Sequence, residues 1–328
     1  MSIRIGTRAS KLALTQTQQT ADQLAAVGGF PVELVHIKTE GDVRTGSLSQ
    51  MGGTGVFVAA LRDALLAETC DVAVHSLKDL PTGAAVGLRI AATPKRVDVR
   101  DVLCARDGLT LAELPGGAKV GTGSPRRAAQ LRAARPDIEV LDIRGNVDTR
   151  LGRVPGLPGN VTDEVVPGKS CDLDAVVLAA AGLERMDRLD TVSEFFETDV
   201  MLPAPGQGAL AIECRTADAP QVEGSNGVLA QALAALNDDD TRLAVTAERA
   251  VLARLEAGCA APVGAYAFRK GSMLHLEAVV CAVDGTKTVR EKKATDGLTE
   301  VGATLLGIEV AELLLAAGAA EIADLAAS

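Results

Sequence analysis

The sequence predicts an α/β protein of two or three domains. Short apolar runs alternate with helical patterns up to about residue 215, which is the rhythm of βαβ units with helices covering a sheet. The chain has 328 residues, of which 47% are hydrophobic, so it is long enough to form two or three separate cores. A stretch bearing Gly, Pro and Asn at 217–227 then interrupts the alternation, and we place a domain boundary there.

The individual strands are predicted from short runs of apolar and β-branched residues. In chain order they are expected at residues 3–5, 32–37, 72–74, 88–91, 101–104, 138–143 and 175–178. Helical patterns lie between several of them, beginning with one over about 10–27 that Ser10 can cap and a second over 56–66. Ser124 followed by Pro125 favours the start of another helix. Beyond the boundary, helices are expected from about Thr241 and over 299–316.

Two stretches are predicted to be loops. Residues 39–55 are polar and rich in glycine, which at this length indicates either a mobile functional loop or a solvated surface excursion. Residues 152–171 contain three prolines and four glycines and are typical of an exposed insertion.

Composition argues against several classes of function. A net charge of −10 and six aromatic residues disfavour a general nucleic-acid binder. The six cysteines form no C-x-x-C pair and only three histidines occur, so we expect neither a disulfide framework nor a metal site. The first residues lack a signal-type apolar segment, and no run of about 18 apolar residues occurs. We therefore expect a soluble cytoplasmic protein with reduced thiols and no membrane partner.

One segment is basic against this acidic background. Residues 119–153 carry eight basic and four acidic side chains, and seven of the eight are arginines. Arginine offers a planar fork of donors that matches carboxylate or phosphate. The expected partner is a small polyanion.

The sharpest physical signal in this segment is Gly121-Thr122-Gly123-Ser124-Pro125-Arg126-Arg127, directly after an apolar strand end at Val120. Ser124 as the N-cap places both arginines in the first helical turn, beside unpaired backbone N–H groups. Cations oppose the macrodipole there, an arrangement that makes sense if an anion binds. The alternative is that both arginines lie on the surface.

Two further junctions repeat the theme. Gly6-Thr7-Arg8-Ala9-Ser10 joins the first strand to its helix, and the segment 143–150 places Arg144 at a strand end and Arg150 in a helix that Asn146 can cap. Each alone would be ordinary capping. Such junctions meet in the crevice at the carboxyl ends of the strands, so together they favour one cationic site.

Lys78 and Asp79 follow a buried strand in Val74-His75-Ser76-Leu77-Lys78-Asp79-Leu80-Pro81. Alone they suggest a surface ion pair. Among arginines, Asp79 is an acid in a basic site, where it would stay ionised and would stabilise a cationic intermediate.

Cys259 follows Gly258, which we expect to end the helix that begins near Thr241. A helix C-terminus does not activate a thiol, so repeated nucleophilic turnover is disfavoured. Two interpretations stay open: inert burial, or a single covalent attachment of a cofactor.

These motifs together resemble the porphobilinogen deaminase (hydroxymethylbilane synthase) family of tetrapyrrole biosynthesis. The matching segments run in family order at residues 4–14, 71–81, 121–127, 141–151, 202–210 and 255–259. The resemblance implies two periplasmic-binding-protein-like lobes of mixed sheets flanked by helices, plus a smaller α+β C-terminal domain. The domains expected from it are 1–98 with 203–222, 99–202, and 223–328.

The resemblance also implies an activity. Cys259 would hold a dipyrromethane cofactor through a thioether, and four porphobilinogen molecules would be added to it head-to-tail with loss of ammonia, releasing linear hydroxymethylbilane. Asp79, with Lys78, would be catalytic. The implied cofactor-binding residues are Cys259, Lys78, Asp79, Thr122, Ser124, Arg126, Arg127, Arg144 and Gly145. The implied substrate-binding residues are Arg8, Ser10, Arg144, Arg150, Arg185 and Gln207. We expect a monomer.

The chain departs from the family pattern in its loops. Thr54 stands in Gly52-Gly53-Thr54-Gly55 where many relatives have lysine, and the stretches at 152–171 and before Leu233 are longer than usual. Two other functions fit part of the evidence. A cytoplasmic bilobed sensor for a small carboxylate would explain the lobes and the arginines, although it would not explain Cys259. An enzyme of phosphorylated metabolites would use the helix at Ser124.

Overall fold

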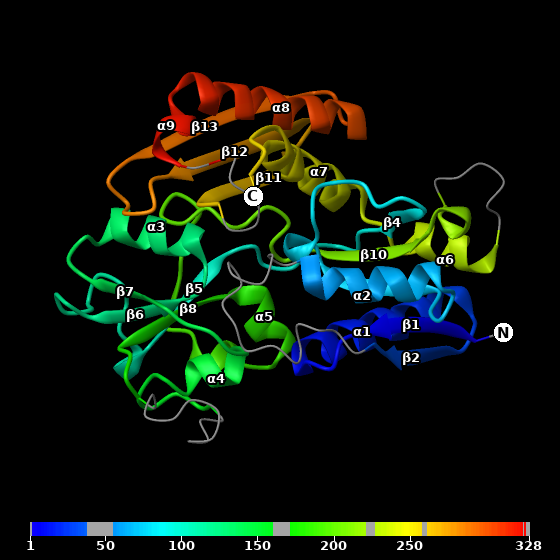
Figure 1. Cartoon of the computed structure of the whole chain (residues 1–328), viewed down its shortest axis with the longest axis horizontal. Helices are drawn as coiled ribbons and strands as arrows, with labels where there is room; N and C mark the ends of the chain where they lie inside the picture. The colour runs from blue at the N-terminus through cyan, green and yellow to red at the C-terminus, as the bar shows by residue number, and fades with distance from the viewer. Residues whose placement is uncertain are drawn as a thin grey trace.

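Two mixed sheets and one smaller antiparallel sheet organise the protein (Figure 1). The computed structural model describes residues 2–37, 55–159, 171–220, 227–257, 261–323 and 325. Each of the two lobes contains a five-stranded sheet with helices against it, and the third part packs helices on a three-stranded sheet. The predicted α/β class, with two lobes and a smaller α+β C-terminal domain, is confirmed.

The first lobe has the strand order β2-β1-β3-β10-β4. β1 runs parallel to β2 and β3, whereas β10 is antiparallel to β3 and β4. Its strands are β1 (Ile3–Thr7), β2 (Val32–His36), β3 (Val72–Ser76), β4 (Leu88–Ala92) and β10 (Leu210–Arg215), and its helices are α1 (Lys11–Gly28), α2 (Gly55–Leu66) and α6 (Val228–Leu236). The chain therefore returns to this sheet after passing through the second lobe.

The second lobe has the order β7-β6-β8-β5-β9, with β6 parallel to β7 and β8 and with β5 antiparallel to both of its neighbours. Its strands are β5 (Asp101–Ala105), β6 (Lys119–Thr122), β7 (Glu139–Asp142), β8 (Ala175–Ala179) and β9 (Glu194–Phe195). Its helices are α3 (Pro125–Ala134), α4 (Val147–Leu151) and α5 (Ala180–Arg185). The carboxyl ends of parallel β6 and β7 lie at one edge, and the arginine-bearing turns leave from that edge.

The third part is an antiparallel sheet covered by two long helices. Its strands are β11 (Val263–Lys270), β12 (Met273–Cys281) and β13 (Thr288–Thr295), and its helices are α7 (Asp239–Arg254), α8 (Glu300–Ala316) and α9 (Ala319–Ile322). Buried residues of α7, α8 and the sheet form one hydrophobic core. This part lies above both lobes in the view of Figure 1.

Each strand and helix range predicted from the sequence is occupied by an element of the expected type, apart from small shifts at the ends. Helix α7 begins two residues before Thr241, because the Asp238 carboxylate accepts the Thr241 N–H at 2.8 Å. The prediction that Gly258 ends this helix is wrong. The helix ends at Arg254, and Glu256 takes the left-handed conformation with φ of 52°. Its N–H and that of Ala257 then bond to carbonyls of the last turn.

Two crossover segments, residues 93–100 and 202–209, connect the lobes and touch each other. The Val97 N–H donates to the Gly208 carbonyl at 3.4 Å. Gly208 has φ of +85°, and a Cβ there would lie 2.8 Å from the Val97 carbonyl oxygen. Only glycine fits this conformation and this close approach, which accounts for one of the two glycines in Gly206-Gln207-Gly208.

The packing of α6 bears on the expected domain boundary at residue 222. Ala232 and Leu233 of α6 lie in the same core cluster as Ile5 and Leu24 of the first lobe. We therefore propose that the first domain extends through α6 and that the third begins with α7.

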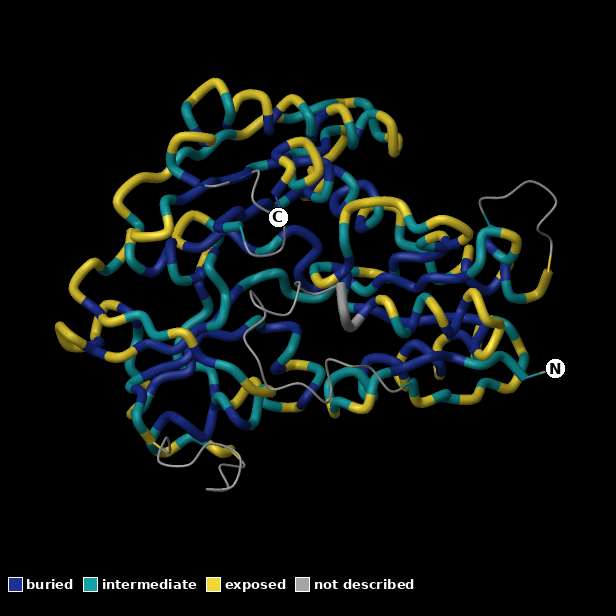
Figure 2. The backbone as a smooth tube through the Cα atoms, viewed as in Figure 1, coloured by how far each residue is buried: buried dark blue, intermediate teal, exposed yellow. Residues whose placement is uncertain are grey.

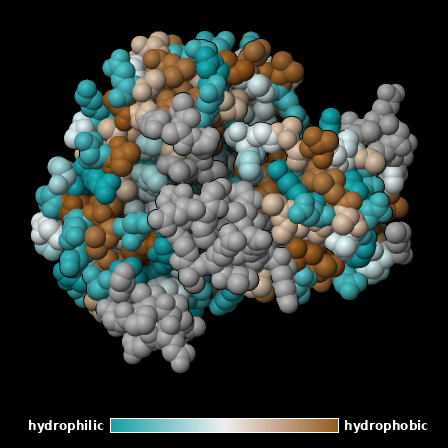
Figure 3. Space-filling model, viewed as in Figure 1, coloured by the Kyte–Doolittle hydropathy of each residue, from teal (hydrophilic) through white to brown (hydrophobic). Residues whose placement is uncertain are grey.

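Figure 2 shows buried backbone concentrated in the sheets and in the inner faces of the helices. Hydrophilic and hydrophobic side chains are mixed over the described part of the surface in Figure 3. Val301, Leu305 and Leu313 of α8 are among the exposed apolar residues. Within the described ranges, no helix is both long enough and apolar enough to cross a membrane.

Glu248 joins the third part to the crossovers, and its removal tests this junction. The fully buried carboxylate accepts two N–H groups of Arg96, at 2.6 and 3.0 Å, and the backbone N–H groups of Gly206 and Ala267, at 2.7 and 2.8 Å. Glu248→Ala leaves Arg96 buried without its counter-charge, so we expect a loss of about 3–5 kcal/mol of unfolding free energy. Urea unfolding measures it.

The matched control is Glu309→Ala, which removes a half-exposed ion pair between Glu309 of α8 and Lys293 of β13. We expect that change to cost less than about 1 kcal/mol. Equal unfolding midpoints for the two variants would contradict the role given to Glu248.

Candidate active site

The turn between β6 and α3 is built as the sequence predicts. The Ser124 hydroxyl accepts the Arg127 N–H at 3.5 Å and caps α3, and the Thr122 hydroxyl accepts the Ser124 N–H at 3.3 Å. Gly123 lies against the residue that follows β7, since a Cβ there would be 2.5 Å from the Ile143 carbonyl oxygen. The turn is thus fixed on both sides, and it sets the direction of the two arginines that follow.

Arg126 and Arg127 do not lie on the surface, because both side chains are buried against Asp101. The Arg126 Nη1 lies 2.7 Å from one Asp101 oxygen, and the Arg127 Nη2 lies 2.8 Å from the other. Arg126 also donates to the Leu202 carbonyl, and Arg127 donates to the Val177 carbonyl. The surface alternative for these two residues is therefore wrong.

The charge balance at this point favours an anion. Burial alone would raise the pKa of Asp101, but the two guanidiniums hold it at about 2. Burial lowers the pKa of Arg126, and the nearby Arg127 lowers it further. One carboxylate thus faces two guanidiniums, which leaves a positive excess.

Lys78 and Asp79 form a short 3-10 turn directly after β3. The Lys78 Nζ lies 3.3 Å from the Gln207 Oε1, and the Gln207 Nε2 donates to Asp101 at 2.8 Å. Lys78 of the first lobe is thereby connected to the arginines of the second. Burial, and then the charge of Arg127, lowers the pKa of Lys78 to about 8. The Asp79 side chain is exposed.

Arg144, Gly145 and Arg150 lie on the neighbouring turn between β7 and α4. Arg144 pairs with Asp142 at 3.2 Å, and the Arg150 Nε donates to the Gly145 carbonyl at 2.8 Å. Burial, and then Arg127 and Arg144, lowers the pKa of Arg150 to about 10. Gly145 has φ of +113°, where a side chain would also meet Thr149.

Arg8 and Ser10 follow β1, the parallel neighbour of β3, so they leave the sheet at the same edge as Lys78. Ser10 caps α1 by accepting the Ala13 N–H at 3.4 Å. Arg185, at the end of α5, donates to the Gly208 carbonyl at 2.9 Å, and burial lowers its pKa to about 10.

The structure thus links much of the predicted site across the two lobes. The residues connected by the contacts and charges above are Lys78, Arg126, Arg127, Arg144, Arg150 and Gln207. Cys259, Gly258, Thr54 and most of the loop 39–55 lie outside the described residues, as does 160–170 of the insertion. Ala257 and Ala261 flank Cys259 and pack on the core of the third part.

Sequence reasoning missed the two acids that hold the site together. Asp101 begins an apolar strand and Glu248 lies among Ala247, Ala250 and Val251 of a helix. An acid embedded in an apolar pattern was the available signal, since such an acid is rarely buried without a partner. In neither case does the local sequence identify the partner.

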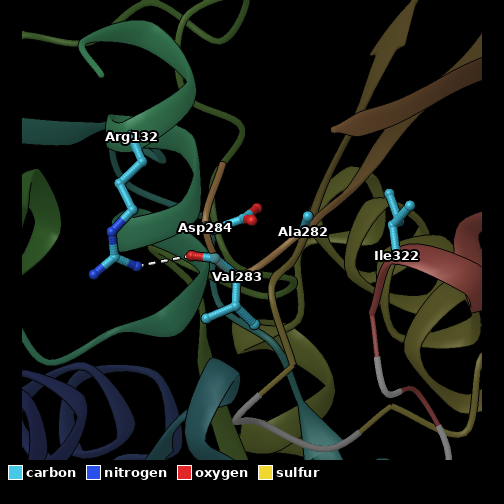
Figure 4. A pocket seen from close by; sticks show the side chains of 5 residues that line it. All are labelled: Arg132, Ala282, Val283, Asp284 and Ile322. Carbon is cyan, nitrogen blue, oxygen red and sulfur yellow. Dashed lines mark hydrogen bonds between the residues drawn. The ribbon is translucent and has the colours of Figure 1, made fainter. Parts of the chain in front are cut away.

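One cavity, of about 590 Å³, lies away from these residues and is lined by Arg132, Ala282, Val283, Asp284 and Ile322. Within this lining, Arg132 donates to the Val283 carbonyl at 2.7 Å (Figure 4). No predicted site residue lines it. Among the described residues, no cluster of His, Cys, Asp and Glu is suited to hold a metal ion.

Comparison with known proteins gives a consistent result. Residues 3–223 match the model of the porphobilinogen deaminase dipyromethane cofactor binding domain, and residues 242–316 match that of the porphobilinogen deaminase C-terminal domain. Porphobilinogen deaminase of Cutibacterium acnes is 55% identical over 338 residues, which cover 100% of this chain and 98% of the relative.

The porphobilinogen deaminase of Thermobifida fusca is 53% identical over 331 residues, covering 99% of this chain and 97% of that protein. Among solved structures, the methionine binding protein MetQ aligns with 71% of this chain and 89% of its own, at 13% identity and a TM-score of 0.41. On the two matching domain models and the full-length relatives, the chain belongs to the porphobilinogen deaminase family.

Proposed function

We propose that the chain is a hydroxymethylbilane synthase. It joins four porphobilinogen molecules head-to-tail with loss of ammonia, on a dipyrromethane bound through Cys259, and releases linear hydroxymethylbilane. The observation that carries this proposal is the match of residues 3–223 to the cofactor-binding domain of the family, which contains every linked residue of the site.

The donors of the site fit a dipyrromethane. Its pyrroles carry acetate and propionate groups, and the buried Nε atoms of Arg126 and Arg144 have no hydrogen-bond partner within the described structure. An unpartnered buried donor is costly, and a carboxylate would satisfy it. Thr122, Ser124 and Gly145 shape the turns that carry these arginines. When bound, the cofactor would supply the pyrrole carbon to which the first substrate is joined.

Binding of the substrate rests on the remaining cations. Lys78, Arg8, Arg150 and Arg185 would pair with the acetate and propionate of porphobilinogen, each charge-assisted pair contributing about 1.5–3 kcal/mol. Ser10 and Gln207 would add neutral contacts. Because these residues come from both lobes, the bound substrate would contact both lobes.

Asp79 would carry the repeated chemistry. The aminomethyl group reacts as its ammonium form: its carbon–nitrogen bond breaks, ammonia leaves with the electron pair, and a cation delocalised over the pyrrole remains. An exposed carboxylate at the edge of a cationic site can accept the pyrrole N–H, stabilise that cation and take up the proton that is lost when the new carbon–carbon bond forms.

The carboxylate sensor and the enzyme of phosphorylated metabolites account for less. Both fit the lobes and the arginines, but neither accounts for a second match, at residues 242–316, to the deaminase C-terminal domain. Monomeric state and a cytoplasmic location are part of the proposal, and sedimentation and cell fractionation test them.

The covalent cofactor gives the most direct test. Intact mass spectrometry of the purified protein should show the polypeptide plus a dipyrromethane increment, and Cys259→Ser should show the bare polypeptide. Ehrlich's reagent should colour the first protein and not the second. Cys171→Ser, which changes an exposed thiol, is the matched control and should keep the increment. A bare wild-type polypeptide without porphobilinogen consumption would contradict the function.

Asp79→Asn removes the negative charge and keeps the shape. We expect kcat to fall by at least about 100-fold, because charge stabilisation and proton transfer are both lost. Single-turnover measurement of ammonia release checks it, with the melting temperature as a fold control. Turnover within twofold of wild type would remove Asp79 from the mechanism.

The depressed pKa of Lys78 predicts a pH dependence. Lys78 binds a carboxylate only when protonated, and its pKa lies at about 8. We therefore expect kcat/KM to fall as pH rises through about 8, and Lys78→Arg to move that fall upward by more than one pH unit. Coincident pH profiles for the two proteins would show that another group titrates.

A further inference from the structure

The turn that carries Lys78 and Asp79 is held by a side chain from the third part of the chain. Arg249 of α7 donates from Nη1 to the Leu80 carbonyl at 2.8 Å and from Nη2 to the Pro81 carbonyl at 2.6 Å. These carbonyls are one and two residues beyond Asp79. The Arg249 guanidinium therefore binds the backbone directly after the turn that carries Lys78 and Asp79.

Other contacts also restrain this turn. The Leu77 N–H donates to the Ala209 carbonyl at 3.0 Å, and Leu77 and Leu80 pack with Val245 of α7 in a small core. A cavity of about 280 Å³ borders the contact between α7 and the turn, and it is lined by Leu77, Thr82 and Arg249 among others. Beside this cavity, the Arg249 fork joins α7 to the backbone of the turn by two hydrogen bonds.

The chemistry of the fork favours positioning. Leu80 leaves the 3-10 turn in an extended conformation, with φ of −87° and ψ of 125°, and both its carbonyl and that of Pro81 accept from Arg249. A planar guanidinium fixes both at once, whereas an ammonium group binds as a point charge. Two short charge-assisted hydrogen bonds fix both the position and the orientation of the backbone that follows Asp79.

We infer that Arg249 is a positioning residue for Asp79, and this inference rests on the proposed function. Helix α7 ends at Arg254, five residues before Cys259, and it also carries Glu248, which binds Arg96 and Gly206 of the crossovers. Helix α7 thus positions the turn that carries Lys78 and Asp79, and it leads into the segment that contains Cys259. A shift of about 1 Å in a reacting group costs on the order of 100-fold in rate.

The test compares Arg249→Met, which keeps the apolar stem, with Arg249→Lys, which keeps the charge. Arg254→Met is the control, since that exposed arginine on the same helix pairs with exposed Glu312. In preparations of equal cofactor mass increment, we expect kcat to fall about 10- to 100-fold in Arg249→Met with KM within about threefold. Arg249→Lys should recover part of the loss, and Arg254→Met should match wild type.

A double variant separates positioning from general support of the fold. If Arg249 acts through Asp79, adding Arg249→Met to Asp79→Asn causes little further loss of kcat. Losses that multiply, or an Arg249→Met enzyme within twofold of wild-type kcat, would overturn the inference. If Arg249→Met does not fold, Arg249→Lys carries the same cycle.

Hydrogen–deuterium exchange gives a readout that is independent of turnover. The peptide that covers residues 77–82 should exchange faster in Arg249→Met than in Arg254→Met. Equal exchange in the two variants would contradict the positioning role of Arg249. The proposed function fails separately, through a wild-type protein without the pyrrole increment. Failure of the Arg249 series in an active, loaded enzyme overturns only the positioning role.

Discussion

The structure depends on a buried carboxylate at the junction of the two lobes. Asp101 is fully buried, pairs with Arg126 and Arg127, and accepts the amide of Gln207, which in turn binds Lys78. Burying two guanidiniums side by side is affordable only with a counter-charge between them. Because Asp101 supplies a single negative charge, the cluster stays cationic. The same contact therefore stabilises the fold and leaves a site for an anion.

Glu248 joins the third part to the crossover segments, as Asp101 joins the two lobes to each other. It binds Arg96 and Gly206 of the two crossover segments from the middle of α7. Both acids thus make contacts within residues 93–101 and 202–208, the short segments that connect the two lobes. Movement between the two lobes and the third part would have to pivot at these segments, where the two carboxylates bind. The ionic contacts therefore define which segments can bend and which must move as units.

The sequence predicted what is encoded locally. Ser10, Ser124 and Asn146 cap helices through N–H groups three residues away, so a short window contains all of the information. Asp101 finds its partners 26 and 106 residues away, and no window shows them. The expected cap at Gly258 failed because Glu256 adopted the left-handed conformation, a preference too weak in glutamate to be predicted.

The lowered pKa values of Lys78, Arg150 and Arg185 share a physical meaning. Burial makes each charged form less favourable than in water, and neighbouring arginines add to this effect at Lys78 and Arg150, so the site without a ligand is electrostatically strained. A polycarboxylate relieves that strain. Each added pyrrole brings an acetate and a propionate while the number of cations stays fixed. Carboxylates bound early must therefore exchange partners or reach solvent as the product lengthens, and affinity per pyrrole must decline toward release.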